Sequence, residues 1–161
     1  MKLDTILVPL DGSALAESAL PRATELAEAS GARLLLLRAA EAHTLQGVDP
    51  TDAQVRVVAE AEAYLTRAAE RVHVQGLGRV ETSVWYGPAP YAIVEAAEHH
   101  HADLIVMTTH GRSGLGRLIL GSVAETVLRG TRTPILLLRA PHAPVERPQV
   151  TTEHPHPQGA R

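Results

Sequence analysis

Short apolar runs that alternate with longer segments of helical periodicity are the feature that most constrains the fold of this 161-residue chain. Parallel strands that are covered on both faces read as nearly unbroken apolar runs, and each parallel connection needs a crossover, usually a helix. The alternation therefore predicts a single-domain α/β protein with a doubly wound, five-stranded parallel sheet and helices on both faces. The expected strands are residues 5–10, 32–39, 79–86, 103–109 and 135–139.

The segments between these runs have the spacing of helices that bury one face. We expect helices at residues 14–30, 52–75 and 91–99, and a last helix that follows a glycine-rich loop and ends at residue 128. Ser13 is a suitable N-cap for the first helix, and Gly31 is placed to end it.

The end of the chain differs in composition from the rest. From residue 141 on, proline, histidine and threonine are frequent and the apolar periodicity is lost. We therefore expect residues 141–161 to be a disordered tail behind a domain of residues 1–140.

Charge and composition exclude several classes of function. The formal net charge is −3, which provides no basic field for a nucleic acid partner. The chain has no cysteine, so disulfides, thiol catalysis and cysteine zinc sites are excluded. No run approaches the roughly 18 apolar residues of a membrane span, and the first residues lack the apolar core of a signal peptide. We expect a cytoplasmic protein that does not associate with membranes.

The stretch THGRSGLGRLILGS, residues 109–122, connects the fourth expected strand to the last helix. Its glycine spacing is that of a P-loop, but Arg117 and Leu118 stand in place of the lysine and the hydroxyl residue, and no GxGxxG fingerprint follows the first strand. Gly121 and Ser122 lie at the expected helix start, where unpaired N–H groups and the helix dipole suit a phosphate. The alternative is that the glycines only turn the chain and Ser122 is only an N-cap.

Residues 1–140 resemble the universal stress protein family over essentially their whole length. The resemblance rests on ILVPLDGS near the start and LIVMTTHGRSGLGRLILGSVAETVLRGTRTPILLL near the end, in the family's order and spacing. It implies an adenine nucleotide alpha hydrolase-like fold with the same five-stranded sheet, and a homodimer through the last strand, residues 135–139. It also implies that the chain is similar to a branch of the family that binds ATP.

The ATP-binding branch carries the pattern G-x2-G-x9-G followed by Ser or Thr. Gly111, Gly121 and Ser122 match this pattern, whereas Thr108 stands at the position of the first glycine. A β-branched residue disfavours positive φ and adds bulk where a ribose or phosphate would approach.

The resemblance also implies a ligand and a set of site residues. The ligand is ATP or another adenine nucleotide, with any Mg²⁺ held by the phosphates. The ends of the first two strands are implied to line the adenosine pocket, and Ser122 and Val123 to donate main-chain N–H groups to phosphate. The implied nucleotide-binding residues are Pro9, Leu10, Asp11, Ala39, Met107, Thr108, His110, Gly111, Arg112, Gly114, Gly121, Ser122 and Val123.

Three functions stay open at this stage. The first is a regulatory, nucleotide-binding stress-response module with an unknown protein partner. The second is a nucleotide-free dimeric interaction protein, which Thr108 would favour, and the third is a slow ATPase or phosphotransferase. Asp11, which is equally suited to capping a turn, and His110 are the nearby candidates for a general base, and neither has an evident orienting partner. We therefore assign no catalytic residue.

We also expect no metal site. The run of three histidines at residues 99–101 lies at the end of an expected helix, where consecutive side chains point in different directions. A solvated helix end is the better interpretation of this run.

Overall fold

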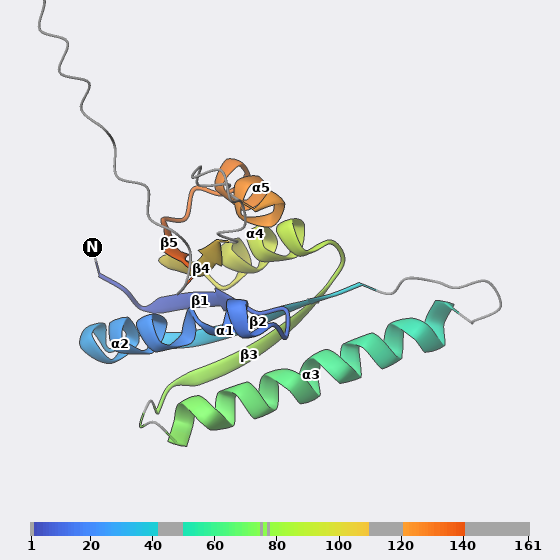
Figure 1. The fold of residues 1–161 in the computed structure, drawn as a ribbon, viewed down its shortest axis with the longest axis horizontal. Coiled ribbons are helices and arrows are strands. Elements are labelled where there is room, and N and C mark those ends of the chain that lie inside the picture. Colours follow the sequence, from blue (N-terminus) through green and yellow to red (C-terminus); the bar gives the residue numbers. More distant parts are fainter. Residues whose placement is uncertain (1, 42–49, 75, 77, 110–120, 141–161) are drawn as a thin grey trace, which may run out of the picture.

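The computed structural model describes residues 2–41, 50–74, 76, 78–109 and 121–140. Neighbouring strands are parallel throughout, and their order in the sheet is β3-β2-β1-β4-β5 (Figure 1). This confirms the predicted five-stranded parallel sheet, with each strand close to its expected bounds. The strands are β1 (Thr5–Pro9), β2 (Arg33–Ala40), β3 (Val80–Tyr86), β4 (Leu104–Thr109) and β5 (Ile135–Arg139).

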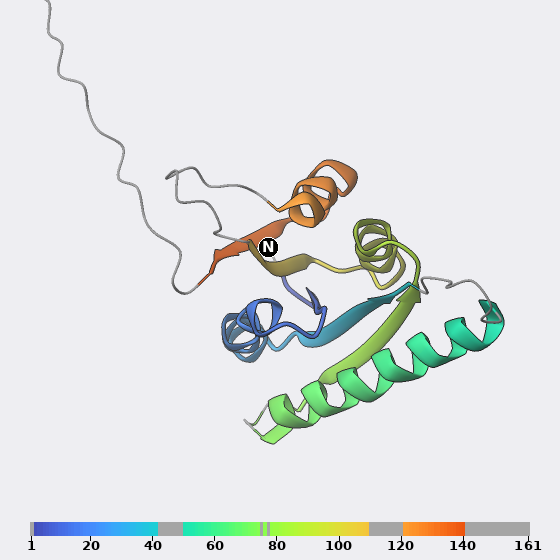
Figure 2. The same cartoon turned by 45° about the vertical axis from the view of Figure 1, so that its right-hand side comes forward.

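Helices cover both faces of the sheet. They are α1 (Ala14–Glu17), α2 (Leu20–Ser30), α3 (Pro50–Val74), α4 (Ala89–His99) and α5 (Ser122–Gly130). Figure 2 shows α4 and α5 on one face and α1, α2 and α3 on the other. In β1, Ile6 and Val8 pack toward α2 and α3, whereas Leu7 packs toward α4 and α5. Side chains of the central strands point alternately to the two faces of the sheet, and each face is covered by an apolar core. The central strands are therefore continuous apolar runs.

The first helical segment is broken, and the prediction of one helix over residues 14–30 was wrong on this point. Ser13 caps α1 as expected, because its hydroxyl accepts the N–H of Ala16 at 3.1 Å. Gly31 ends α2 in the left-handed conformation, with φ 73°. Between them, Pro21 lacks an N–H and its ring would clash with the carbonyl of Glu17 in a continuous helix. The chain therefore leaves α1 at Glu17 and begins α2 afterwards.

The long helix α3 packs mainly through its second half. From Ala61 onward its buried residues are spaced by three or four positions and face β2 and β3, namely Ala61, Leu65, Ala68, Ala69 and Val72. Its first turns extend beyond the sheet in Figures 1 and 2, and Val55 is 64% exposed there. No helix in the described part of the chain is long and apolar enough to span a membrane.

Asp103 joins the beginnings of β1 and β4, the neighbouring strands at which the strand order along the sheet reverses. Its carboxylate accepts the main-chain N–H groups of Asp4 at 2.8 Å and Thr5 at 2.9 Å. Its own N–H donates to the carbonyl of Thr5 at 2.9 Å. The two N–H donors stabilise the charged carboxylate, so the pKa of Asp103 lies below its ordinary value.

These hydrogen bonds, which we call the Asp103 clamp, make part of the free energy of unfolding depend on pH. Because the pKa of Asp103 is lower in the folded state than in the unfolded state, its stabilisation is fully present above the unfolded value of about 4 and is lost as the pH falls through the lowered value. The Asp103→Asn variant keeps the acceptor oxygen but not the charge, so we expect a loss of about 1 kcal/mol at pH 7 for this partly exposed group. Urea denaturation should show the difference between the two proteins shrinking from pH 6 toward pH 2. A difference that is independent of pH would contradict this account.

Candidate nucleotide site

A cavity of about 260 Å³ lies at the carboxyl ends of the central strands. Strand order reverses here, because β1 has β2 on one side and β4 on the other. In open α/β sheets, ligands bind beyond the carboxyl ends of the strands at such a reversal.

Every predicted site residue that the structure describes lines this cavity. They come from the ends of three strands and from the start of α5, namely Pro9, Leu10, Asp11, Ala39, Met107, Thr108, Gly121, Ser122 and Val123. The other predicted residues, His110, Gly111, Arg112 and Gly114, lie outside the described residues. The structure therefore brings the described set together, while its role in nucleotide binding stays a prediction.

Other lining residues were not predicted from the sequence. They are Ser13, Leu15, Ala16, Arg38, Ala89, Ile93 and Ala124. The α1 residues face the cavity because the chain turns at Asp11 and Gly12, and their spacing alone does not reveal this direction. Arg38 had a detectable signal, since it is a charged residue at the carboxyl end of an apolar strand, next to Ala39.

The start of α5 supplies the polar wall of the cavity. Gly121 is the N-cap residue, with φ −59° and ψ 150°, and no side-chain bond caps this end within the described residues. Ser122 is the first helical residue, so the alternative in which Ser122 is the N-cap was wrong. The first N–H groups of a helix have no partner within it and lie at the positive end of its dipole. This end of α5 is therefore suited to bind an anion.

Asp11 shapes the turn that follows β1. Its carboxylate accepts the N–H of Ser13 at 2.8 Å, and Gly12 between them has φ +87°, which a side chain would disfavour. Asp11 thus caps the strand-to-helix turn, as one interpretation of the sequence held, and it also lines the cavity.

Thr108 occupies the first motif position without strain. It lies within β4, and the positive φ that its side chain would disfavour is absent here. Its hydroxyl donates to the carbonyl of Leu15 in α1 at 2.9 Å. The side chain thereby ties the end of β4 to α1 on the face opposite α4 and α5.

The histidines at the end of α4 form a contact away from the cavity. His100 is partly buried, with its Nε2 at 3.3 Å from the hydroxyl of Ser83, whereas His99 and His101 are exposed. The run is therefore only partly the solvated helix end that we expected. Desolvation lowers the pKa of His100. Among the described residues, no group of three or more His, Asp or Glu side chains is arranged to hold a metal ion.

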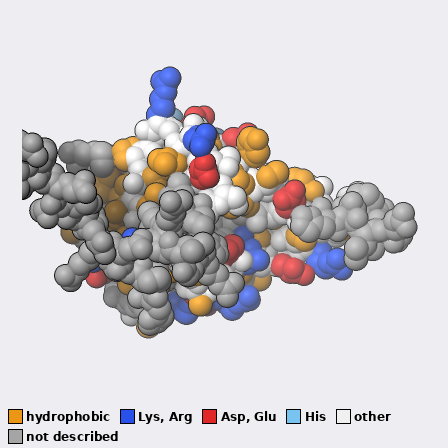
Figure 3. Space-filling model, turned by 45° about the horizontal axis from the view of Figure 1, so that its top comes forward, with side chains coloured by type: hydrophobic (Ala, Val, Ile, Leu, Met, Phe, Trp, Pro, Cys, Tyr) orange, Lys and Arg blue, Asp and Glu red, His pale blue; other side chains and the backbone are white. Residues whose placement is uncertain are grey.

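The charges on the described surface are mixed. On the face in Figure 3, Lys and Arg side chains are interspersed with Asp and Glu side chains. The described residues of this face thus form no extended field of one sign that would attract a polyanion.

The fold and the cavity together define an α/β protein with a cavity at the carboxyl edge of its parallel sheet, and sequence comparison identifies its family. The family model described as the universal stress protein family matches residues 2–139. A putative universal stress protein of Staphylococcus aureus is 32% identical over 151 residues, which are 91% of each chain. This chain belongs to the universal stress protein family.

Solved structures share the fold. A member of the family from Burkholderia pseudomallei superposes with a TM-score of 0.69 at 31% identity, over 85% of this chain and 96% of that one. A universal stress protein whose structure was solved in complex with cAMP superposes with a TM-score of 0.69 at 27% identity, over 87% of this chain and 99% of that one.

The hydrogen bond of Thr108 leads to a measurable expectation. The Thr108→Val variant keeps the shape of the side chain but loses the bond to Leu15, so we expect a loss of about 1 kcal/mol of stability in urea denaturation. Thr66→Val is the matched control, because its hydroxyl bonds to the carbonyl of Glu62 on an exposed helix surface. Equal effects of the two substitutions would show that the bond to α1 adds no stability.

Proposed function

We propose that this universal stress protein binds ATP or a related adenine nucleotide in the cavity at the carboxyl edge of its sheet. One observation carries the proposal: the described residues that the family resemblance implies for nucleotide binding line a single cavity, although they come from separate parts of the chain. A related protein that binds cAMP, with 27% identity, supports an adenine nucleotide as the ligand.

The chemistry of the walls fits the two ends of a nucleotide. Leu10, Ala39, Ile93 and Met107 offer an apolar surface suited to a purine ring. The start of α5 offers N–H groups and a positive dipole end for phosphate. In this proposal, any Mg²⁺ is carried by the phosphates of the ligand.

The proposed role is regulatory. Asp11 is engaged by the N–H of Ser13, and we assign no general base among the described residues of the cavity. Bound nucleotide would then favour one conformation of a dimer, or of a surface that a protein partner contacts. It would do so because a ligand shifts the population toward the conformation that it binds more tightly.

Calorimetric titration with ATP and Mg²⁺ tests this function. We expect micromolar binding by the protein after removal of any nucleotide that was purified with it. In the Gly121→Val variant, the affinity should fall at least about tenfold, because the isopropyl group would fill space beside the N–H groups of α5. Valine adopts the φ and ψ of Gly121 readily, so the backbone should be preserved.

Gly78→Val is the matched control for this titration. Gly78 has no heavy atom within 4 Å of an added Cβ and does not line the cavity, so its affinity for ATP should equal that of the original protein. Absence of binding by the original protein up to millimolar ATP would refute the proposal. It would leave the nucleotide-free interaction protein as the better hypothesis.

We further propose that the protein is a homodimer through β5. This strand is the last in the sheet order, so its outer edge has no partner strand among the described residues. Its residues Ile135, Leu136, Leu137 and Leu138 are apolar and only partly buried. An apolar edge strand invites pairing, and pairing with a second copy about a twofold axis gives a closed assembly.

Light scattering during gel filtration tests the dimer. We expect twice the mass of one chain at micromolar concentration, and the mass of one chain for Leu138→Arg, which places a charge at the proposed interface. Val55→Arg is the control, because Val55 is 64% exposed on α3, away from β5. A monomeric original protein would contradict the proposal.

A further inference from the structure

Arg38 is a charged side chain in the cavity that the family pattern does not include. It lies near the carboxyl end of β2, is partly buried, and lines the cavity. Because side chains alternate along a strand, it shares a face with Leu34 and Leu36, toward α1 and α3. A Cβ added to Gly12 would be 3.4 Å from its Nη1 atom. The guanidinium therefore lies beside the turn that joins β1 to α1.

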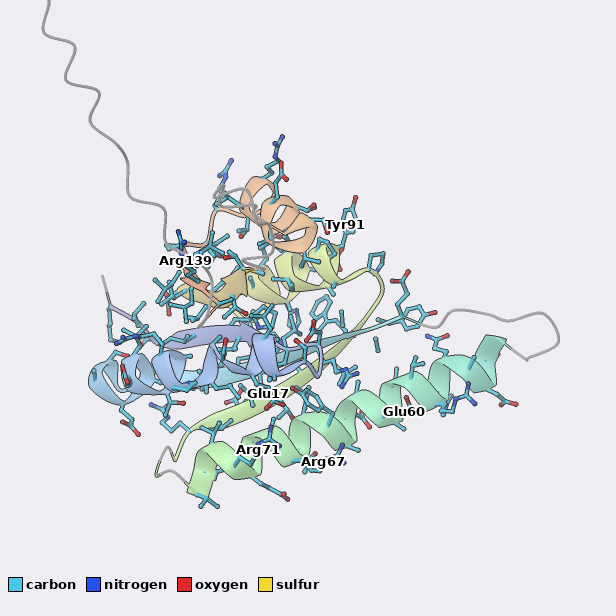
Figure 4. The ribbon with its side chains drawn as sticks, viewed as in Figure 1. Glu17, Glu60, Arg67, Arg71, Tyr91 and Arg139 are labelled. Carbon is cyan, nitrogen blue, oxygen red and sulfur yellow. The ribbon has the colours of Figure 1, made fainter. Side chains whose placement is uncertain are left out.

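The ring of Tyr64 also contacts this guanidinium. The Cζ atom of Arg38 is 4.6 Å from the ring centroid, which is a cation–π contact. The hydroxyl of Tyr64 donates to Glu17 at 2.8 Å, and Glu17 also pairs with Arg71 at 2.9 Å. Figure 4 shows Glu17 and Arg71 approaching each other between α1 and α3.

These bonds fix the position of the ring. Burial and the bond to Glu17 raise the pKa of Tyr64, so its hydroxyl stays protonated and remains a donor. Tyr64 is thus held in place where its ring contacts the guanidinium of Arg38.

The edge of the guanidinium remains available to a ligand. Within the described part of the chain, no carboxylate forms an ion pair with Arg38. A guanidinium in a cation–π contact keeps its N–H donors, which form a fork in its plane. A partly buried guanidinium that lines a cavity in this way needs hydrogen-bond acceptors from whatever fills the cavity.

The place of Arg38 indicates which part of a nucleotide it meets. The phosphate-binding end of α5 follows β4, whereas Arg38 belongs to β2, and β1 lies between these strands. Two strand spacings amount to about 10 Å. A mononucleotide with its phosphate at α5 would therefore place its nucleoside near β2.

We propose that Arg38, held on the ring of Tyr64, donates hydrogen bonds to acceptor atoms of the ribose or base and so selects for the nucleoside end of the ligand. This inference rests on the proposed nucleotide binding. It assigns Arg38 a task separate from the phosphate contacts at α5, and the two tasks are separable by experiment.

The test compares adenosine with AMP in calorimetric titrations of three proteins. In the original protein, the ratio of the two affinities measures the contribution of the phosphate. The Arg38→Met variant should bind both ligands about tenfold more weakly, with the ratio unchanged. The Gly121→Val variant should instead lower the ratio, because it affects the phosphate alone.

Two further variants guard against an effect on folding. Arg22→Met removes an arginine of an exposed ion pair on α2 that does not line the cavity, and it should bind adenosine as the original protein does. Arg38→Lys keeps the charge and most of the stem but loses the fork, so its affinity for adenosine should fall by less than that of Arg38→Met. It also provides the comparison if Arg38→Met proves unstable in thermal denaturation.

Three results would overturn the assignment. Unchanged adenosine binding by both Arg38 variants would show that the guanidinium does not meet the ligand. A lowered ratio of AMP to adenosine affinity in Arg38→Met would make it a phosphate contact instead. Absence of adenosine and AMP binding by the original protein would remove the assignment of Arg38, and the proposed function fails as well only if ATP is not bound either.

Discussion

The strands β1, β2 and β4 are buried on both faces. A parallel sheet is covered in this way because its strands need crossover connections, and helices in these connections pack on its faces. The apolar runs Ile6 to Val8 and Leu34 to Leu37 are almost fully excluded from solvent for this reason. The same requirement sends the chain to one face for α1, α2 and α3 and to the other for α4 and α5. Where the strand order reverses, at β1 and β4, a cavity lies at the carboxyl ends of the strands.

The cavity therefore depends on the sheet rather than on a dedicated binding domain. The clamp of Asp103 on Asp4 and Thr5 secures β1 against β4 at the opposite end of the strands. At the carboxyl end, the turn of Asp11 and the hydroxyl of Thr108 hold α1 in place. Packing defines where a ligand can enter, and a few polar groups define what it can be.

Much of this arrangement was predictable from the sequence. Apolar runs and helical spacing indicated all five strands and their parallel arrangement, because those patterns reflect burial directly. The carboxyl edge was also predictable as the place of the cavity, because every parallel strand of such a sheet ends there. The described site residues implied by the family pattern then proved to share one cavity.

Three features were not predicted, and two of them depend on contacts between distant residues. Pro21 is a local signal for the break between α1 and α2. The helical spacing of the apolar residues nevertheless continues across this break, so the spacing alone predicted one helix. The bond from Thr108 to Leu15 joins residues far apart in sequence. The contact of Arg38 with Tyr64 depends on how the long helix α3 lies across the sheet, which periodicity does not specify.

Two polar side chains of the cavity lie on the same face of the sheet, namely Thr108 at the first position of the family pattern and Arg38 outside that pattern. The hydroxyl of Thr108 contacts α1 and the guanidinium of Arg38 contacts α3, whereas Ala39, Met107 and the start of α5 line the cavity from the side of α4 and α5. The hydroxyl of Thr108 already donates to Leu15, so its effect on a ligand is mainly steric. The guanidinium of Arg38 adds donors to the same wall. A difference in ligand preference between this protein and relatives that keep the first glycine is therefore expected at the α1 face of the cavity, where added bulk and added donors act together.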